Sequence, residues 1–117
     1  MDSLRIKELI SKYPTVISTC DVGQPNISVA MDVDMIDDET IIISHNEMKQ
    51  TIENVKNNEN ICLLILNDDK EGIRVFGKAG YYDDGEYLKY VIDKFKNERT
   101  NPLGAIVIKI ETAEKIS

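Results

Sequence analysis

A short polar segment near the middle of the chain combines several side chains that could hold an anion. Residues 41–55 begin with three isoleucines, pass through a polar turn, and continue with apolar residues at helical spacing, which predicts a strand, a turn and a helix. The turn and the first helical residues carry hydroxyl, amide, imidazole and ammonium groups: Ser44, His45, Asn46, Lys49, Gln50 and Thr51. A helix start has unpaired backbone N–H groups and a favourable dipole for negative charge. The segment therefore predicts an anion site, with phosphate as the preferred ligand.

The remaining reactive side chains do not form a metal or acid–base site by their spacing. His45 is the only histidine, and the sequence shows neither a metal-ligand pattern nor a placed nucleophile partner for it, whereas zinc sites and nucleophilic catalysis need such partners. The acidic run at 32–39 departs from the calcium-loop pattern at its third ligand and at its glycine. We expect no metal, and the sequence identifies no catalytic residue.

Composition limits the class of protein. The chain has 117 residues and a net charge of −7, which predicts one domain over residues 1–117 and argues against nucleic acid as a partner, because an acidic surface repels phosphate backbones. The longest apolar run, Ile61–Leu66, is too short to cross a membrane. The first residues lack a signal-peptide pattern, and the two cysteines lie in separate expected strands, so we expect a cytoplasmic protein.

Strand patterns dominate the rest of the chain. We expect strands at 15–22, 26–36, 40–44, 61–66, 73–82 and 105–111, with a short addition at 114–116, and helices at 2–12, 47–57 and 86–97. Gly77 and Gly80 are expected bulge or bend positions. Short turns between the first three strands exclude parallel βαβ alternation. The elements predict a mainly β fold, a small Greek-key or meander barrel with helices on its outside.

The order of these elements resembles a known family. A hairpin and a strand precede Met48-Lys49-Gln50-Thr51, with Asn54 in the same helix, and an apolar strand then precedes the stretch Gly72–Ala79. This arrangement, from residue 14 to residue 116, resembles the pyridoxamine 5′-phosphate oxidase-like, FMN-binding split-barrel family, and most of all its small single-domain flavin-binding proteins. The resemblance implies a six-stranded antiparallel split β-barrel of Greek-key type with two or three flanking helices.

The same resemblance implies a cofactor site and an assembly. Family members are homodimers with two FMN sites at the interface, and their phosphate lies on a Lys-Thr pair at the start of the helix. Thr51 matches that threonine, while Gln50 stands at the lysine position and Lys49 one step earlier, so either could contact the phosphate. The implied site consists of Val29, Ala30, Met31, Ile43, Ser44, His45, Asn46, Lys49, Gln50 and Thr51.

Two classes of function follow. The first is a flavin-dependent oxidoreductase that takes electrons from a nicotinamide, another small molecule or a protein. The second is a non-catalytic flavin carrier, electron-transfer protein or ligand-binding barrel. Residues 105–117 lack the Arg and His pair that binds substrate in true pyridoxamine phosphate oxidases, so oxidation of vitamin B6 is not expected. The sequence leaves the substrate open, and also the choice between FMN and a related deazaflavin.

Overall fold

The structure is a computed structural model that describes residues 3–98 and 100–116. The described residues form three helices and seven strands: α1 (Ser3–Lys12), β1 (Thr15–Asp21), β2 (Gln24–Ala30), β3 (Val33–Asp37), β4 (Thr40–His45), α2 (Lys49–Asn57), β5 (Asn60–Leu66), β6 (Gly72–Tyr82), α3 (Gly85–Phe95) and β7 (Gly104–Ile116). The mainly β composition with flanking helices is as the sequence predicted.

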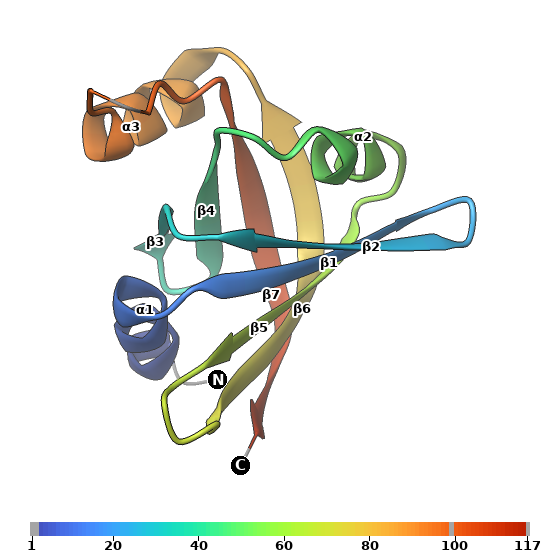
Figure 1. The fold of residues 1–117 in the computed structure, drawn as a ribbon, viewed down its shortest axis with the longest axis vertical. Coiled ribbons are helices and arrows are strands. Elements are labelled where there is room, and N and C mark those ends of the chain that lie inside the picture. The colour runs from blue at the N-terminus through green and yellow to red at the C-terminus, as the bar shows by residue number, and fades with distance from the viewer. Residues whose placement is uncertain (1–2, 99, 117) are drawn as a thin grey trace.

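All seven strands belong to one antiparallel sheet with the order β2-β1-β5-β6-β7-β4-β3. The sheet curves strongly around its interior, and its two edge strands, β2 and β3, follow each other in the chain without pairing (Figure 1). The result is an open split barrel. Its strand number differs from the predicted six because the single strand expected at 26–36 is broken at Met31 and Asp32. The expected strand at 105–111 and the addition at 114–116 are one continuous strand, β7.

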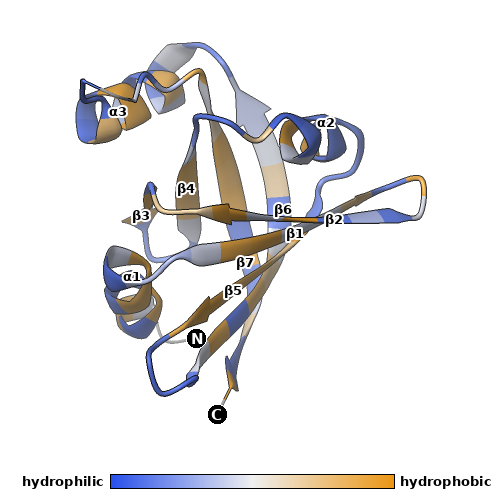
Figure 2. Cartoon of the chain, in the orientation of Figure 1, coloured by the Kyte–Doolittle hydropathy of each residue, from blue (hydrophilic) through white to orange (hydrophobic). Residues whose placement is uncertain are grey.

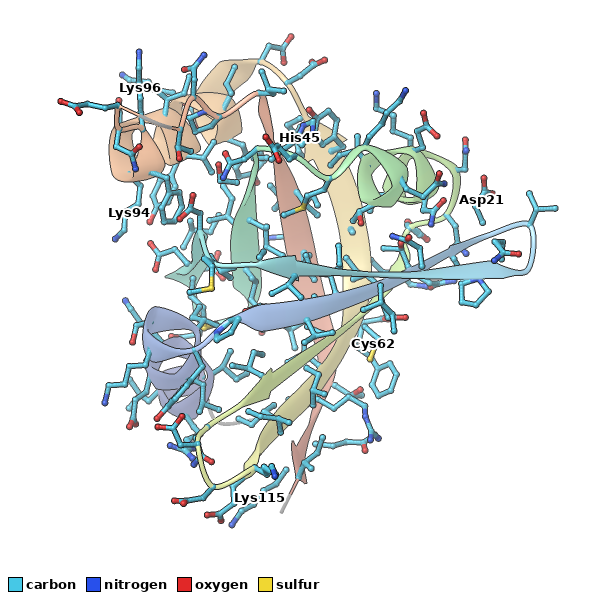
Figure 3. The ribbon with its side chains drawn as sticks, in the orientation of Figure 1. Asp21, His45, Cys62, Lys94, Lys96 and Lys115 are labelled. Atoms are coloured by element: carbon cyan, nitrogen blue, oxygen red, sulfur yellow. The ribbon has the colours of Figure 1, made fainter. Side chains whose placement is uncertain are left out.

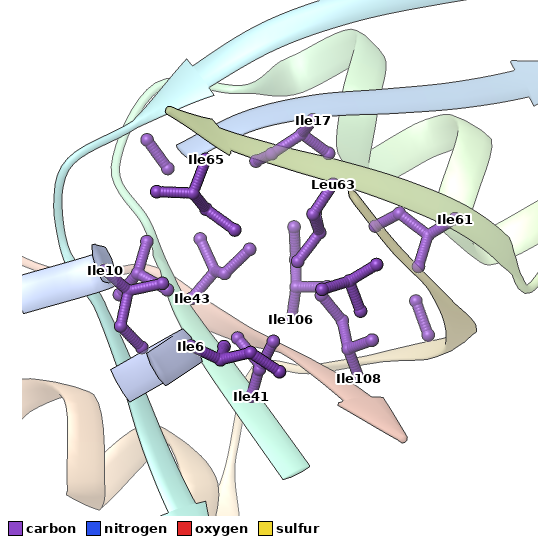
Figure 4. Close-up of a cluster of buried hydrophobic side chains, with 14 of the residues drawn as sticks. Ile6, Ile10, Ile17, Ile41, Ile43, Ile61, Leu63, Ile65, Ile106 and Ile108 are labelled. Carbon is purple, nitrogen blue, oxygen red and sulfur yellow. The ribbon is translucent and has the colours of Figure 1, made fainter. Parts of the chain in front are cut away.

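The main core fills the inside of the curved sheet. Isoleucines of β4 and β7 meet Leu63 of β5, and Ile6 and Ile10 of α1 close one end of this cluster (Figure 4). A smaller cluster lies on the other side of β4 and β7, where Ile42 and Val107 pack against Val91 of α3. Strand β4 is therefore buried on both faces.

The unbroken apolar run Ile61–Leu66 is typical of a strand buried on both faces, but β5, which contains it, is buried on one face only. In β5 the inward residues Ile61, Leu63 and Ile65 are buried, whereas the alternate residues Cys62, Leu64 and Leu66 are half-exposed on the outside. Polar residues gather instead at the turn between β5 and β6 (Figure 2). One face of β5 thus presents apolar side chains that the single chain leaves uncovered.

Two local features fix the positions of the long strand β6 and of α3. The pairing of β6 with β7 shifts between Phe76 and Gly77, as expected, whereas Gly80 pairs regularly. A side chain at Gly77 would overlap the Lys109 carbonyl. On the other side, Asp34 of β3 accepts a hydrogen bond from the Tyr90 hydroxyl of α3. That hydrogen bond raises the pKa of Tyr90 to about 12.

Candidate functional site

A cavity of about 610 Å³ lies between the end of β2, the end of β4 and the start of α2. We call it the ring cavity. Its lining residues are Val29, Ala30, Met31, Asp32, Ser44, Asn46, Glu47, Met48, Thr100, Asn101 and Leu103. Half of the residues predicted for the cofactor site, namely Val29, Ala30, Met31, Ser44 and Asn46, are thereby brought together.

The two walls of the ring cavity differ in character. Val29 and Met31 contribute an apolar wall, and their side chains are 58% and 65% exposed. Opposite them a polar edge is held in place by hydrogen bonds, because Asn46 Nδ2 donates to Asp32 Oδ2 over 3.0 Å and Ser44 Oγ donates to Asn46 Oδ1 over 3.0 Å. The backbone also links these segments, since Ser44 N donates to Asp32 O over 2.9 Å. An apolar slot with a fixed polar edge suits a flat heteroaromatic ring.

The start of α2 borders this cavity and offers backbone donors. Met48 is the N-cap residue and makes no side-chain cap hydrogen bond, and Ile52 N donates the first helical bond, to Met48 O, over 2.9 Å. The N–H groups of Lys49, Gln50 and Thr51 precede that bond and have no partner within the helix. Among the described residues, Lys49 forms no ion pair and its side chain is exposed. The start of α2 thus offers the free backbone donors that the predicted anion seat would need.

Thr51 itself is in a polar network between α2 and β2. Its side chain is 1% exposed. Thr51 Oγ1 lies 2.7 Å from Ser28 Oγ and accepts a hydrogen bond from Asn26 Nδ2 over 3.1 Å. Gln50 is also engaged, because its Nε2 donates to Asn54 Oδ1 over 2.9 Å. The Thr51 hydroxyl and the Gln50 amide, which the sequence predicted to contact a phosphate, are therefore hydrogen-bonded to other side chains of the protein. The partners of Thr51 on β2, Ser28 and Asn26, are added as candidate site residues.

The sequence reasoning missed Asn26 and Ser28, although a signal exists. They alternate with Ile27 and Val29 along β2, and period-two alternation places them on the face that looks at α2. Asp32 and Leu103 were missed because they come from segments whose neighbours depend on the sheet order. The other predicted residues lie apart from the ring cavity: Ile43 is fully buried in the core, and His45 and Lys49 line a neighbouring cavity.

His45 stands at the end of β4 beside α2 (Figure 3). Its Nδ1 is 2.6 Å from the Tyr81 hydroxyl, and the two rings meet edge to face with centroids 5.4 Å apart. Lys56 Nζ lies 5.1 Å from the centroid of the same Tyr81 ring. Burial and the Lys56 charge lower the pKa of His45, and burial raises the pKa of Tyr81. Both groups are therefore neutral at pH 7.

Metal and membrane sites find no support in residues 3–98 and 100–116. No group of three His, Cys, Asp or Glu side chains in this part of the chain is placed to hold a metal ion. The helices of the same residues are all too short or too polar to span a bilayer.

The open antiparallel sheet defines a split-barrel protein, and comparison with known proteins agrees. Residues 5–117 match the pyridoxamine 5′-phosphate oxidase family, and the chain belongs to that family. An uncharacterized protein of Methanocaldococcus jannaschii is 30% identical over 109 residues, which is 90% of this chain and 73% of that protein.

Two crystal structures show the same fold. HupZ of group A Streptococcus superimposes with a TM-score of 0.90 at 26% identity, covering 99% of this chain and 94% of HupZ. An FMN-binding protein of Syntrophomonas wolfei superimposes with a TM-score of 0.86 at 26% identity, covering 97% of this chain and 85% of that one.

Proposed function

We propose that the protein binds FMN, with the isoalloxazine ring in the ring cavity and the phosphate at the start of α2. The observation that supports this most is the adjacency of the two features. A cavity with one apolar wall and one polar edge opens beside a helix start that carries no side-chain cap. The likeness to the FMN-binding protein of Syntrophomonas wolfei, at 26% identity, points the same way.

The residues present fit the chemistry of this cofactor. Val29 and Met31 would contact the faces of the ring, while Asn46 and Asp32 would meet its hydrogen-bonding edge. The unpaired N–H groups at the start of α2 and the Lys49 ammonium supply the positive potential that a phosphate requires. The hydroxyls of Ser28 and Thr51 lie close together beside that helix start. FMN would bring the redox chemistry when bound, and the chain would bind it and orient it.

We further propose that the bound flavin serves an oxidoreductase whose electron donor is a small molecule or a protein. A non-catalytic flavin carrier is the second candidate. Asp32, Ser44 and Asn46 of the ring cavity are hydrogen-bonded to one another. A fixed polar edge of this kind would orient a flavin in a carrier as well as in an enzyme, so it does not favour either. Anaerobic mixing with reduced nicotinamide tests the enzyme, because rapid bleaching of the flavin absorbance would select the oxidoreductase over the carrier.

The working assembly we propose is a homodimer with a flavin site at each side of its interface. The outer face of the sheet formed by β2, β1, β5 and β6 carries an apolar row in register, in which Val29 pairs with Val16 and Val16 with Leu64. Ile27, on the same face, is 69% exposed. Val29 belongs both to this face and to the ring cavity, so a second copy on the face would cover the cavity.

Binding of FMN is tested by fluorescence titration with riboflavin as the comparison ligand. Several charge-assisted hydrogen bonds to the phosphate, each worth about 1.5–3 kcal/mol, should make riboflavin bind at least tenfold more weakly. Lys49→Gln should weaken FMN most at low salt, and Lys89→Gln on the exposed side of α3 is the control with the same net charge. Equal affinities for FMN and riboflavin would refute the phosphate seat.

The homodimer is tested by light scattering at micromolar concentration. An obligate interface should bury about 2,000 Å² or more in total, and Ile27→Asp should split the dimer because it places a charge on the apolar face beside that row. Leu4→Asp is the matched control, since Leu4 is 80% exposed on α1, away from this face. A mass of 13.3 kDa for the unchanged protein, the single-chain value, would overturn the proposed assembly.

A further inference from the structure

We infer that a second cavity, next to the ring cavity, binds a small carboxylate or phosphate compound with an apolar body. This cavity of about 520 Å³ is the His45 cavity, and its lining includes His45, Met48, Lys49, Ile52, Lys56 and Leu103. That the ligand is the substrate of the flavin rests on the proposed FMN function. The binding of the ligand itself does not.

Hydrogen-bonding groups converge at one corner of the His45 cavity. His45 and Lys56 both line it, and Tyr81 lies behind them and holds both, through the 2.6 Å hydrogen bond to His45 Nδ1 and through its ring face under the Lys56 ammonium. When Tyr81 donates to Nδ1, the His45 proton resides on Nε2 and is available to an acceptor. Lys56 adds a fixed positive charge at the same corner.

The charges around the cavity favour an anion at this corner. Glu47 and Glu53 also line the cavity, but both side chains are exposed at its rim. Among the described residues, neither forms an ion pair with Lys49 or Lys56. Lys56 is close enough to His45 to lower its pKa, as described above. A carboxylate or phosphate oxygen at the corner would meet the ammonium and a neutral N–H donor together.

Apolar residues form the other walls of the His45 cavity and would contact an apolar body attached to the anionic group. Met48 and Ile52 of the α2 region form one wall, and Leu103, 57% exposed, forms part of the other. Leu103 is fixed there because its N–H donates to His45 O over 2.9 Å. The ring cavity shares Asn46, Glu47, Met48 and Leu103 with the His45 cavity. A ligand in one cavity would therefore lie next to a ligand in the other, as a flavin substrate must.

The single imidazole of the chain gives a direct test. The His45 imidazole resonance is followed by NMR in tag-free protein, with and without saturating FMN, while benzoate is added. We expect a saturable shift and a higher His45 pKa, because a bound carboxylate counteracts the Lys56 charge. Benzamide has the same body without the charge and should bind much more weakly. Lys56→Gln should weaken benzoate about tenfold, the loss of one charge-assisted hydrogen bond, and Lys89→Gln should leave it unchanged.

Three results would overturn the inference, and a fourth would overturn the proposed flavin function while supporting the binding site. No saturable shift up to the solubility of benzoate would remove the site. Equal shifts with benzamide, or equal weakening by both lysine variants, would remove anion recognition. Loss of the benzoate response on adding FMN would make the cavity part of the flavin site. Protein that fails to bind FMN but keeps the benzoate response would refute the proposed flavin function alone.

Discussion

Thr51→Val should destabilise the fold, and the size of the effect follows from the network around the side chain. Valine keeps the shape of threonine but removes the hydroxyl, which lies 2.7 Å from Ser28 Oγ and accepts from Asn26 Nδ2 over 3.1 Å. Thr51 is 1% exposed, so water does not take over the hydrogen bonds of the lost hydroxyl. Losing the two hydrogen bonds to half-buried Asn26 and Ser28, at about 0.5–1.5 kcal/mol each, costs about 1–3 kcal/mol, a large fraction of the stability of a small domain.

Urea denaturation measures this loss. With a slope of roughly 1–3 kcal/mol per molar for a small protein, Thr51→Val should lower the midpoint by about 1 M. Thr51→Ser retains the hydroxyl and loses only one methyl group, at about 0.8 kcal/mol. A double-mutant cycle with Ser28→Ala should show a coupling of about 0.5 kcal/mol or more. Equal stabilities for the valine and serine variants would refute the argument that the hydroxyl network joins α2 to β2.

The same variants locate the phosphate. If Thr51 Oγ1 contacts FMN, Thr51→Val weakens FMN by about tenfold while Thr51→Ser does not. If FMN affinity is unchanged although stability falls, the hydroxyl is a structural group. The phosphate would then be held by Lys49 and the N–H groups at the start of α2. Stability and affinity thus answer two separate questions about one side chain.

Three further results are expected. Asp34→Asn should cost about 1–3 kcal/mol, because it weakens the hydrogen bond that fastens α3, and absorbance titration should show the pKa of Tyr90 falling from about 12 towards 10. Because the folded pKa of His45 is lowered, the free energy of unfolding should fall as pH drops through 6.5 towards that folded pKa, a slope absent from His45→Gln in chemical denaturation. Gly104→Ala should lower the melting temperature, since a Cβ there overlaps the Tyr81 ring, and should change the His45 resonance.

Local patterns predicted most of the elements because each depends on neighbours in the sequence. The apolar spacing at residues 3–12 and 85–95 predicts helices with one buried face, and the run of isoleucines in β4 predicts a buried strand. The break at Met31 and Asp32 has no such signal, because the alternation of apolar residues continues through Val33 and Met35 without glycine or proline. The break is made by distant partners, since Asp32 O accepts from Ser44 N and Asp32 Oδ2 from Asn46 Nδ2.

The candidate site likewise combines residues that the sequence predicted with residues that only the fold brings together. The resemblance brought together the residues of β2 and the turn after β4, which share the ring cavity. Leu103 could not be added, since it reaches the cavity only because β7 pairs with β4 and brings residue 103 to His45 O. Tyr81 could not be linked to His45 either, because 36 residues separate them. Periodicity and spacing along the sequence do not predict contacts that depend on the order of strands in the sheet.

Flavin binding and dimerisation should be coupled through β2. Its inward residues Asn26 and Ser28 belong to the network at the start of α2, whereas its outward residues Ile27 and Val29 belong to the exposed apolar face. A ligand that binds only the dimer stabilises it in proportion to the logarithm of ligand concentration over Kd. Saturating FMN should therefore lower the dimer dissociation constant in sedimentation, and Ile27→Asp should weaken FMN although Ile27 touches no part of the ring cavity. A dimer constant that is the same with and without FMN would place the flavin away from the interface.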